Sequence, residues 1–482
     1  MDPHARHSDP PGNKDEKRRG TQNMSETSDR RPTGKLRLFA LTWPILIEFL
    51  LHMLMGSADT FMLSHVSDEA VAAVGVANQL VFLTIILFGF VATGTAVTVA
   101  QYLGARQPAK ASRIAAISVT INLLFGVAVS VLLVLFREQF LHLLQLPPNL
   151  LKFADAYLTI VGGTIFVQAL LVTVSSIVRS HGFTGDAMFV SLGMNLLHVF
   201  GNYLFVFGAL GVPQLGVTGV AISTAVSRTI ACIVMFVLMY RRIQFPIQWS
   251  DYIRLDRQMI RQILKIGVPS AGEQLSYQTS QIMITFFITA LGTAALATRV
   301  YTLNIMFFIM LFGLSLGQGT QILVGHLVGA GQKEAAYRQL LASLKWSLLI
   351  TLAVASAVAV SREHLLGIFT NDPLIVQTGA GLLLFCLILE PGRTFNLVVI
   401  SSLRAAGDVQ FPVFMGILSM WGVSVPLSYY LGIHLHYGLL GVWMAFAADE
   451  WLRGILMYWR WRSRAWEKKA LVQAEGATSA NI

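Results

Sequence analysis

The chain has 482 residues, of which 55% are hydrophobic and only 12% are charged. A soluble protein carries roughly 25% charged residues, so this composition argues against a soluble enzyme, a disordered chain or a nucleic-acid-binding module. The formal net charge is +10, but the basic residues gather in tails and loops, as membrane orientation requires. We therefore predict a polytopic membrane protein with no nucleic-acid partner.

The first 35 residues are polar and charged and contain no apolar segment. We expect residues 1–35 to form a disordered cytoplasmic tail and not a secretory signal. Translation could start at Met1 or at Met24, which the sequence does not distinguish. Cys232 and Cys386 both lie in apolar stretches, which is typical of small buried side chains and not of a disulfide or a metal site.

Twelve apolar stretches follow, separated by short polar loops. Each reaches the ~20 residues that cross a bilayer, and each must be helical because lipid cannot satisfy an open backbone. The predicted spans are 36–63, 71–101, 112–136, 153–178, 187–210, 216–240, 266–290, 296–328, 338–360, 375–403, 411–433 and 439–459. The fold class is therefore an all-α membrane protein.

The distribution of Lys and Arg predicts the orientation. With the N-terminus inside, cytoplasmic segments hold 27 of the 35 basic residues and external loops hold 3. The positive-inside rule then places both termini in the cytoplasm, and we expect a multi-pass protein of the cell inner (plasma) membrane. Residues 463–482 form the second cytoplasmic tail.

The two halves of the chain align without a gap when Pro44 is placed on Pro269, and we call this alignment the half-chain register. The matches cluster at Pro, Glu, Arg and Gly: Glu48 falls on Glu273, Arg179 on Arg404, and Gly182 on Gly407. This repeat predicts two pseudo-symmetric six-helix lobes, an N-lobe at 36–240 and a C-lobe at 266–462, joined by a basic linker at 241–265. Paired lobes of this kind bind a substrate between them and alternate its access.

Several motifs carry a family resemblance. The first span reads LTWPILIEFLLHMLMGSADTFMLSH, the second ends in YLGARQ, and the halves contain VRSHGFTGD from Val178 and LRAAGDVQFP from Leu403. Over about residues 36–462 the chain resembles the multidrug and toxic compound extrusion (MATE) family. The resemblance implies a twelve-helix, two-lobe antiporter that exports drugs, dyes or metabolites in exchange for protons or sodium ions.

Polar side chains on the first span form one predicted stripe. Glu48, His52 and Asp59 fall on nearly the same helix face, because eleven residues make about three turns. A charge inside a span costs at least ~2.5–3.5 kcal/mol, so the stripe should face a wet cavity. A buried, neutral, hydrogen-bonded Asp is the alternative for Asp59. The resemblance implies a cation-coupling role for Asp59, and the stripe itself places Glu48 and His52 in the substrate cavity.

The fifth span presents Asn195, His198 and Asn202 on one face. The resemblance implies that this face, with Thr224, completes the cation-coupling site of Asp59. The family's fifth-helix carboxylate is absent, and His198 stands in the motif. Histidine titrates near neutral pH, so we favour protons over sodium as the coupling ion, with no other cofactor. A histidine that only bonds a neighbouring helix is the alternative.

The second half offers further polar candidates for the substrate cavity. Glu273, Tyr277 and Gln281 lie on the polar seventh span, although Glu273 could instead serve backbone groups freed by Pro269. Glu390 and Arg393, at i and i+3, predict an ion pair that either orients the tenth helix or lines the cavity. Asp449, Glu450 and Arg453 predict a separate structural group near one end of the twelfth helix.

No catalytic motif, nucleotide-binding motif or metal motif is present, which favours a gradient-driven transporter over an enzyme. We expect a monomer in the lipid bilayer whose small-molecule substrate is organic and aromatic or cationic. Two other readings stay open. A lipid-linked oligosaccharide flippase shares the broader fold but would need a strongly cationic cavity. An intramembrane enzyme would not need two matching halves.

Overall fold

The computed structural model describes residues 36–243 and 245–472, and it is helical throughout that part of the chain, without a strand. The expected tail at 1–35 lies outside the described residues. All the described helices belong to one unit, Leu38–Ile482. Its N-half comprises α2 (Leu38–Ser64), α3 (Asp68–Gly104), α4 (Pro108–Leu135), α5 (Arg137–Leu143), α6 (Pro148–Tyr157), η1 (Leu158–Gly162), α7 (Ile165–Ser180), α8 (Thr184–Phe207), η2 (Ala209–Gly211) and α9 (Val217–Arg242).

A short connecting helix, α10 (Trp249–Ile253), precedes the C-half. The C-half comprises α11 (Arg257–Thr289), α12 (Thr293–Gly329), α13 (Lys333–Val360), α14 (Arg362–Gly367), α15 (Pro373–Ala405), α16 (Gln410–Ser419), η3 (Met420–Ser424), α17 (Val425–Tyr429), η4 (Tyr430–His434), α18 (Gly438–Arg462) and η5 (Ala465–Lys468). The prediction of an all-α fold with two pseudo-symmetric six-helix lobes is confirmed.

The predicted spans correspond to twelve long helical segments. Among the described helices, nine are long and apolar enough to cross a membrane, and α6–η1 with α7 makes a tenth that is bent by 46°. The other two predicted spans are α11 and α18, which are less apolar. α18 carries Asp449, Glu450 and Arg453 near its middle, and α11 is rich in polar side chains.

Two spans differ from simple straight helices, and the linker is partly helical. The fourth span contains the π-helical turn η1, and the eleventh contains η3 and η4 on either side of Pro426. Residues 241–265 contain α10 and the first turns of α11. That helix begins at Arg257 because the Asp256 carboxylate accepts hydrogen bonds from the backbone N–H groups of Gln258 and Met259.

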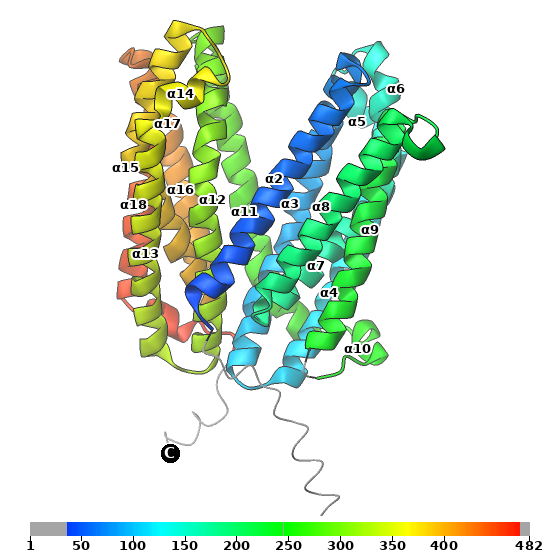
Figure 1. Ribbon diagram of the computed structural model, residues 1–482. Coiled ribbons are helices and arrows are strands. Elements are labelled where there is room, and N and C mark those ends of the chain that lie inside the picture. Colours follow the sequence, from blue (N-terminus) through cyan, green and yellow to red (C-terminus); the bar gives the residue numbers. More distant parts are fainter. Residues whose placement is uncertain (1–35, 244, 473–482) are drawn as a thin grey trace, which may run out of the picture. The chain divides into compact units, whose positions relative to one another are not determined.

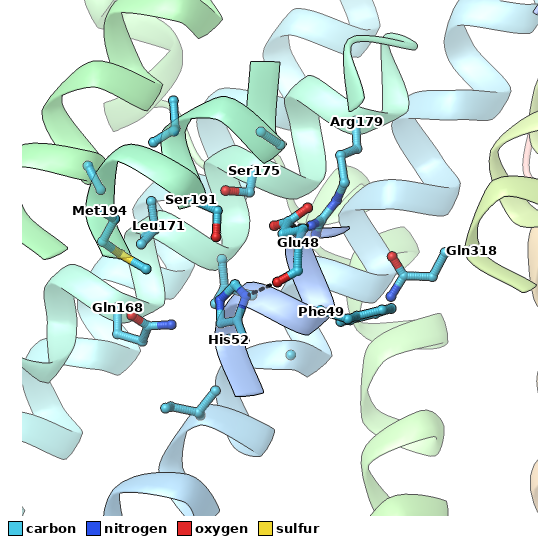
Figure 2. Close-up of a pocket in the computed structure, with 16 residues that line it drawn as sticks. Glu48, Phe49, His52, Gln168, Leu171, Ser175, Arg179, Ser191, Met194 and Gln318 are labelled. Carbon is cyan, nitrogen blue, oxygen red and sulfur yellow. Dashed lines mark hydrogen bonds and ion pairs between the residues drawn. The ribbon is translucent and has the colours of Figure 1, made fainter. Parts of the chain in front are cut away.

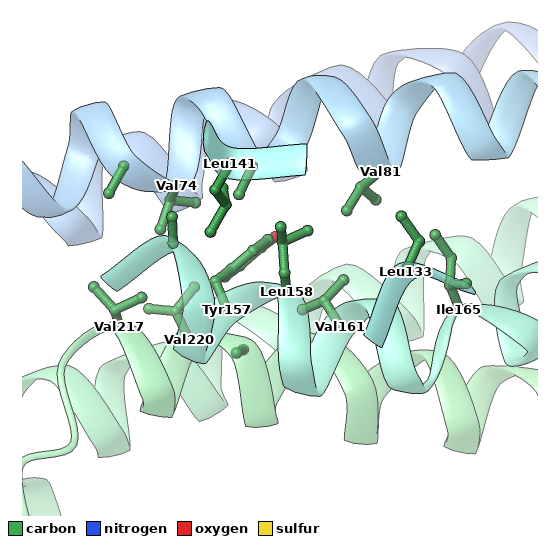
Figure 3. Close-up of a cluster of buried hydrophobic side chains, with 14 of the residues drawn as sticks. Val74, Val81, Leu133, Leu141, Tyr157, Leu158, Val161, Ile165, Val217 and Val220 are labelled. Atoms are coloured by element: carbon green, nitrogen blue, oxygen red, sulfur yellow. The ribbon is translucent and has the colours of Figure 1, made fainter. Parts of the chain in front are cut away.

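Equivalent helices pack together in the two halves. In the N-half α3 and α4 both contact α7, and in the C-half α12 and α13 both contact α15. Figure 3 shows part of the N-half core, where aliphatic side chains from α3, α4, η1 and α9 meet around Tyr157. In a bilayer such packing stabilises through close van der Waals contact, because lipid tails are as apolar as the side chains.

The two halves meet mainly where α3 and α12 end, and we call this the crossing end. A Cβ atom at Gly104 would lie 2.0 Å from the carbonyl oxygen of His326, and one at Gly329 would lie 2.0 Å from that of Gln101. Only glycine allows backbones to approach so closely. Toward the opposite end, Figure 1 shows α2 and α8 leaning away from α11 and α12.

Two matching hydrogen bonds join the halves at the crossing end. Gln101 donates through Nε2 to the carbonyl oxygen of Ala405 at 2.6 Å, and Nε2 of His326 lies 2.8 Å from the carbonyl oxygen of Ser180. The two pairs correspond to each other in the half-chain register. The segment after α18 adds a third contact, because the backbone N–H of Leu471 donates to Oε1 of Gln101 at 2.9 Å.

Candidate functional site

Asp59 sits in a compact polar cluster inside the N-half. Its Oδ1 atom accepts a hydrogen bond from Nδ2 of Asn202 at 2.8 Å and lies 3.1 Å from Nε2 of His198. That same histidine nitrogen is 3.1 Å from Oγ1 of Thr224. The structure therefore brings together side chains from α2, α8 and α9, and all four are buried.

The bonding pattern leaves one carboxylate oxygen available. Oδ2 of Asp59 has no hydrogen-bond partner among the described residues, whereas Oδ1 has two close neighbours. Nδ1 of His198 is buried without a partner in the same part of the chain, which favours the neutral tautomer that carries its proton on Nε2. Oδ2 is thus the atom of this cluster that is best placed to take a proton.

Two more residues lie around the Asp59 cluster. Asn195, although buried, donates to the backbone oxygen of Ser191 on its own helix and does not bond to Asp59. Arg228, one turn beyond Thr224 on α9, was not predicted as a site residue. It interacts electrostatically with Asp59 and with Tyr157.

The predicted stripe on the first span is divided into two sites. Glu48 forms a 2.7 Å ion pair with Arg179 on α7, and in the C-half Glu273 forms a 2.5 Å pair with Arg404 on α15. Both partners of the second pair match those of the first in the half-chain register. Neither carboxylate serves backbone groups freed by the prolines. Each pair instead ties the first helix of its half to the fourth.

A cavity of about 340 Å³ lies beside Glu48, between helices of the N-half (Figure 2). Glu48, His52 and Arg179 line it, and Gln318 on α12 reaches it from the C-half. The remaining lining residues are mostly apolar: Phe49, Ile85, Gly89, Leu171, Val172, Ala187, Val190, Met194 and Ala231, with Gln168, Ser175 and Ser191. Its volume is in the range of small-molecule sites.

Three buried polar atoms of this cavity have no partner among the described residues. They are Oε2 of Glu48, Oε1 of Gln168 and Oγ of Ser191. A buried polar atom without a hydrogen bond costs about 1–3 kcal/mol, and such groups require an explanation wherever they occur. These three atoms are enclosed by protein and are not open to the cavity. The volume of the cavity and its mainly apolar lining around the Glu48–Arg179 pair make it the candidate substrate site.

In the C-half the predicted ion pair is one part of a larger network. Arg393 lies 2.6 Å from Glu390 and 3.4 Å from Glu450, and Glu450 lies 3.1 Å from Arg453. Arg453 also pairs with Asp449 at 2.8 Å. The group expected near a helix end is therefore buried near the middle of α18 and continuous with the first pair.

The C-half residues predicted for substrate binding surround little space. Tyr277, Gln281 and Arg393 line a cavity of about 20 Å³, which has room for about one water molecule. Gln281 accepts a hydrogen bond from Arg299 at 3.1 Å, and Glu273 is engaged by Arg404. In this conformation these side chains form a structural network, and the larger cavity lies in the N-half.

The network gives a stability prediction for Arg393. Replacing Arg393 with Leu leaves Glu390 buried without its cation, which should cost about 3–5 kcal/mol. We expect less folded protein in the membrane, measured by fluorescence-detected size exclusion at matched expression. The double change Glu390→Leu with Arg393→Leu should recover much of the loss, because Glu450 keeps Arg453 and Asn396 as partners. Normal folding of the single variant with altered substrate selection would instead place Arg393 in the binding site.

Two histidines, His181 and His326, lie at the crossing end. His181 follows the last residue of α7, and burial lowers its pKa to about 4. It lies close enough to His326 for the two rings to interact electrostatically. At neutral pH His181 is therefore uncharged, and acidification from about pH 6.5 toward pH 4 should destabilise the folded form as the unfolded chain takes up the proton first.

Comparison with known proteins follows the same two-half division. The MatE family model matches residues 44–204 and 269–430. The chain is 48% identical over 449 residues to the uncharacterized transporter YisQ of Bacillus subtilis, covering 93% of this chain and 99% of YisQ. It is 28% identical over 459 residues to the probable multidrug resistance protein NorM of Thermotoga maritima, covering 92% and 96% of the two chains.

Solved structures share the fold. An outward-facing multidrug resistance MATE family transporter of the MOP superfamily superposes with a TM-score of 0.81 at 21% identity, covering 89% of this chain and 95% of its own. A MATE structure in the bent conformation gives a TM-score of 0.82 at 21% identity, with coverage of 89% and 96%. At this identity the likeness establishes the arrangement of helices and no more.

Proposed function

Because the chain belongs to the MatE family and is a multi-pass membrane transporter, we propose that it is a secondary-active antiporter that exports small organic molecules in exchange for protons. The Asp59 cluster is the observation that carries the proposal. It joins three helices of one lobe around a single buried carboxylate. A change of protonation at Asp59 therefore changes contacts that hold α2, α8 and α9 together.

Coupling requires the driving ion to favour one conformation over the other. Because Oδ2 of Asp59 has no hydrogen-bond partner among the described residues, it can bind a proton when the Asp59 cluster is open to the acidic side of the membrane. Protonation removes the negative charge that His198, Asn202 and Arg228 face. Release of that proton on the other side restores these contacts. The cluster therefore has two states with different hydrogen bonds, and binding of the proton can favour one conformation of the lobes over the other.

One feature favours protons over sodium. A sodium ion needs several oxygen ligands in place of its hydration shell, whereas the groups nearest Oδ1 of Asp59 are N–H groups of His198 and Asn202. A proton adds to one oxygen and needs no ligand shell.

Transport by purified protein in liposomes tests the function. Ethidium-loaded vesicles are given a proton gradient, a sodium gradient or neither, and fluorescence reports export. We expect export driven by the proton gradient and abolished by a protonophore, with no response to sodium alone. Sodium-driven export that persists with a protonophore present would contradict proton coupling. A lack of export under every gradient would contradict the antiport proposal.

Orientation in the inner membrane is part of the same proposal. The crossing end carries the basic segments around 241–265, so we place it and both termini in the cytoplasm. Reporter fusions inserted at residue 246 or placed after Ile482 should be active only as cytoplasmic reporters. Alkaline phosphatase activity at either position, with proper insertion, would contradict the twelve-span topology. Insertion after Trp466 is avoided because that side chain is buried against Trp461.

A further inference from the structure

An apolar groove of about 320 Å³ lies between α8 and α9, which pack side by side in the N-half (Figure 1). We call it the α8–α9 groove. Its apolar lining includes Phe189, Gly193 and Leu197 on α8 and Ile230, Val234 and Leu238 on α9. Phe189 is 65% exposed and Val234 is 42% exposed. The groove therefore opens on the outer surface of the helices, which is the surface that lipid covers in a membrane.

The groove has about the length of one membrane leaflet. Asp186 and Leu197 are its first and last lining residues on α8, and eleven residues of helix rise about 16 Å. The hydrocarbon core of a bilayer is about 30 Å thick, so one leaflet supplies about half of that. Asp186 lies toward the crossing end, because α8 begins at Thr184, shortly after the Ser180 carbonyl oxygen that meets His326. The groove thus extends from the membrane surface on that side to about the middle of the bilayer.

The end of the groove near Asp186 carries an unpaired positive charge. Arg242 donates two hydrogen bonds to the Asp186 carboxylate, at 2.7 and 3.2 Å, so these two charges compensate each other. Arg241 is exposed and has no ion-pair partner in the described part of the chain. It lies on the same face of α9 as Ile230, because eleven residues make about three helical turns. One uncompensated cation therefore continues the line of the apolar groove.

We propose that the α8–α9 groove binds one anionic phospholipid, with an acyl chain along the groove and the headgroup phosphate beside Arg241. A phospholipid carries an anion at the end of an apolar chain, which is the combination that this groove and its single free cation fit. A headgroup with a net negative charge is favoured over a zwitterionic one, since basic side chains at the membrane surface attract anionic lipids. Binding does not depend on the proposed transport function, and only the assignment to the cytoplasmic leaflet depends on the proposed orientation.

The lipid site is separate from the candidate substrate cavity but shares a wall with it. Val190, Met194 and Ala231 line both spaces. A bound acyl chain would pack against the outer side of these three residues, while the substrate cavity lies on their inner side.

Native mass spectrometry of the purified, delipidated full-length protein tests the site. Dioleoyl-phosphatidylglycerol, which is anionic, and dioleoyl-phosphatidylethanolamine, which is zwitterionic, are titrated separately, and the dissociation constant of the first bound lipid is measured. We expect phosphatidylglycerol to bind at least about fivefold more tightly. That ratio corresponds to about 1 kcal/mol, the attraction expected between one arginine and an anionic lipid surface.

Two variants separate the headgroup from the chain. Arg241→Gln should reduce the preference for phosphatidylglycerol to within about twofold. Gly193→Leu should weaken binding of both lipids at least about fivefold, because a Cβ atom at Gly193 has nothing within 4 Å and the longer side chain would fill the groove. Gly193→Ala should give an intermediate value if the leucine variant folds poorly.

Two matched controls change the same chemistry elsewhere. Arg261→Gln removes an equally exposed arginine from α11, where Arg261 also lacks an ion-pair partner among the residues that the structure describes. Gly75→Leu adds the same side chain to α3, where a Cβ atom again has nothing within 4 Å. Both controls should keep the wild-type affinities and the full preference.

Three results would overturn the proposal. Equal affinities for the two lipids in the wild-type protein would remove the role of the headgroup charge. An equal loss of preference in the Arg261→Gln and Arg241→Gln proteins would show attraction by a diffuse basic surface and not by one site. Wild-type lipid binding by a folded Gly193→Leu protein would place the acyl chain outside the α8–α9 groove.

Discussion

Replacing Asp59 with Asn is expected to abolish gradient-driven export while leaving the folded protein in the membrane. Asparagine has nearly the volume of a protonated aspartate, so the packing of α2 against α8 should survive. The variant cannot bind and release a proton at this position. Because a coupling ligand of this kind is worth about 5–150-fold, export under a proton gradient should fall at least about fivefold.

The measurement is ethidium export from energised vesicles that contain matched amounts of wild-type or variant protein. His198→Gln is an informative companion, because glutamine keeps an N–H donor near Asp59. We expect it to retain partial export. Full proton-driven export by the Asp59→Asn protein would remove Asp59 from the mechanism and direct attention to Glu273, whose partner is Arg404.

Sequence reasoning correctly predicted much of the architecture because its signals are periodic. Apolar length predicts spans, and the half-chain register predicts two halves. The half-chain register also contains a signal for two ion pairs that the sequence prediction did not use. Glu48 matches Glu273 and Arg179 matches Arg404, and the structure shows that these four residues form two equivalent ion pairs. Opposite charges that repeat together within a membrane are a signal for pairing, since an isolated charge there is costly.

The Asp59 cluster was only partly predictable. The helical repeat places Asn195, His198 and Asn202 on one face of α8, but it does not say which of them reaches another helix. The rotation and depth of α8 against α2 make that choice, and Asn195 bonds within its own helix. No sequence pattern around Arg228 links this residue to Asp59. Its relation to Asp59 exists only once α9 packs beside α2.

The cavity was harder still to predict. Gln168 and Ser191 lie on α7 and α8 in mostly apolar surroundings, and a single polar residue in a span is commonly satisfied by a neighbour. Their place in the wall of the cavity depends on how α7 and α8 pack, a property with no sequence signature. The bend between α6 and α7 is a similar case, because the π-helical turn Leu158–Gly162 contains neither proline nor charge.

Replacing Gly104 with Ala tests how the crossing end controls access. The added Cβ atom would lie 2.0 Å from the carbonyl oxygen of His326, where no real contact is that short. Overpacking of this kind costs about 1–3 kcal/mol, and the cost applies only while the halves are crossed here. The equilibrium should therefore shift at least about fivefold toward a conformation that is open at the crossing end.

Spin labels at Lys110→Cys and Arg338→Cys can report that opening, since both positions are exposed and lie in different halves, while Cys232 and Cys386 are buried and should not react. Gly104→Ala should lengthen the distance between labels and slow export, because the lobes would return to the crossed state less often. Gly75→Ala on the same helix has nothing within 4 Å of its added Cβ, so it should change neither. An unchanged distance distribution in the Gly104→Ala protein would show that α3 and α12 can separate slightly without opening the path, and that the two hydrogen bonds at Gln101 and His326 hold the halves together instead.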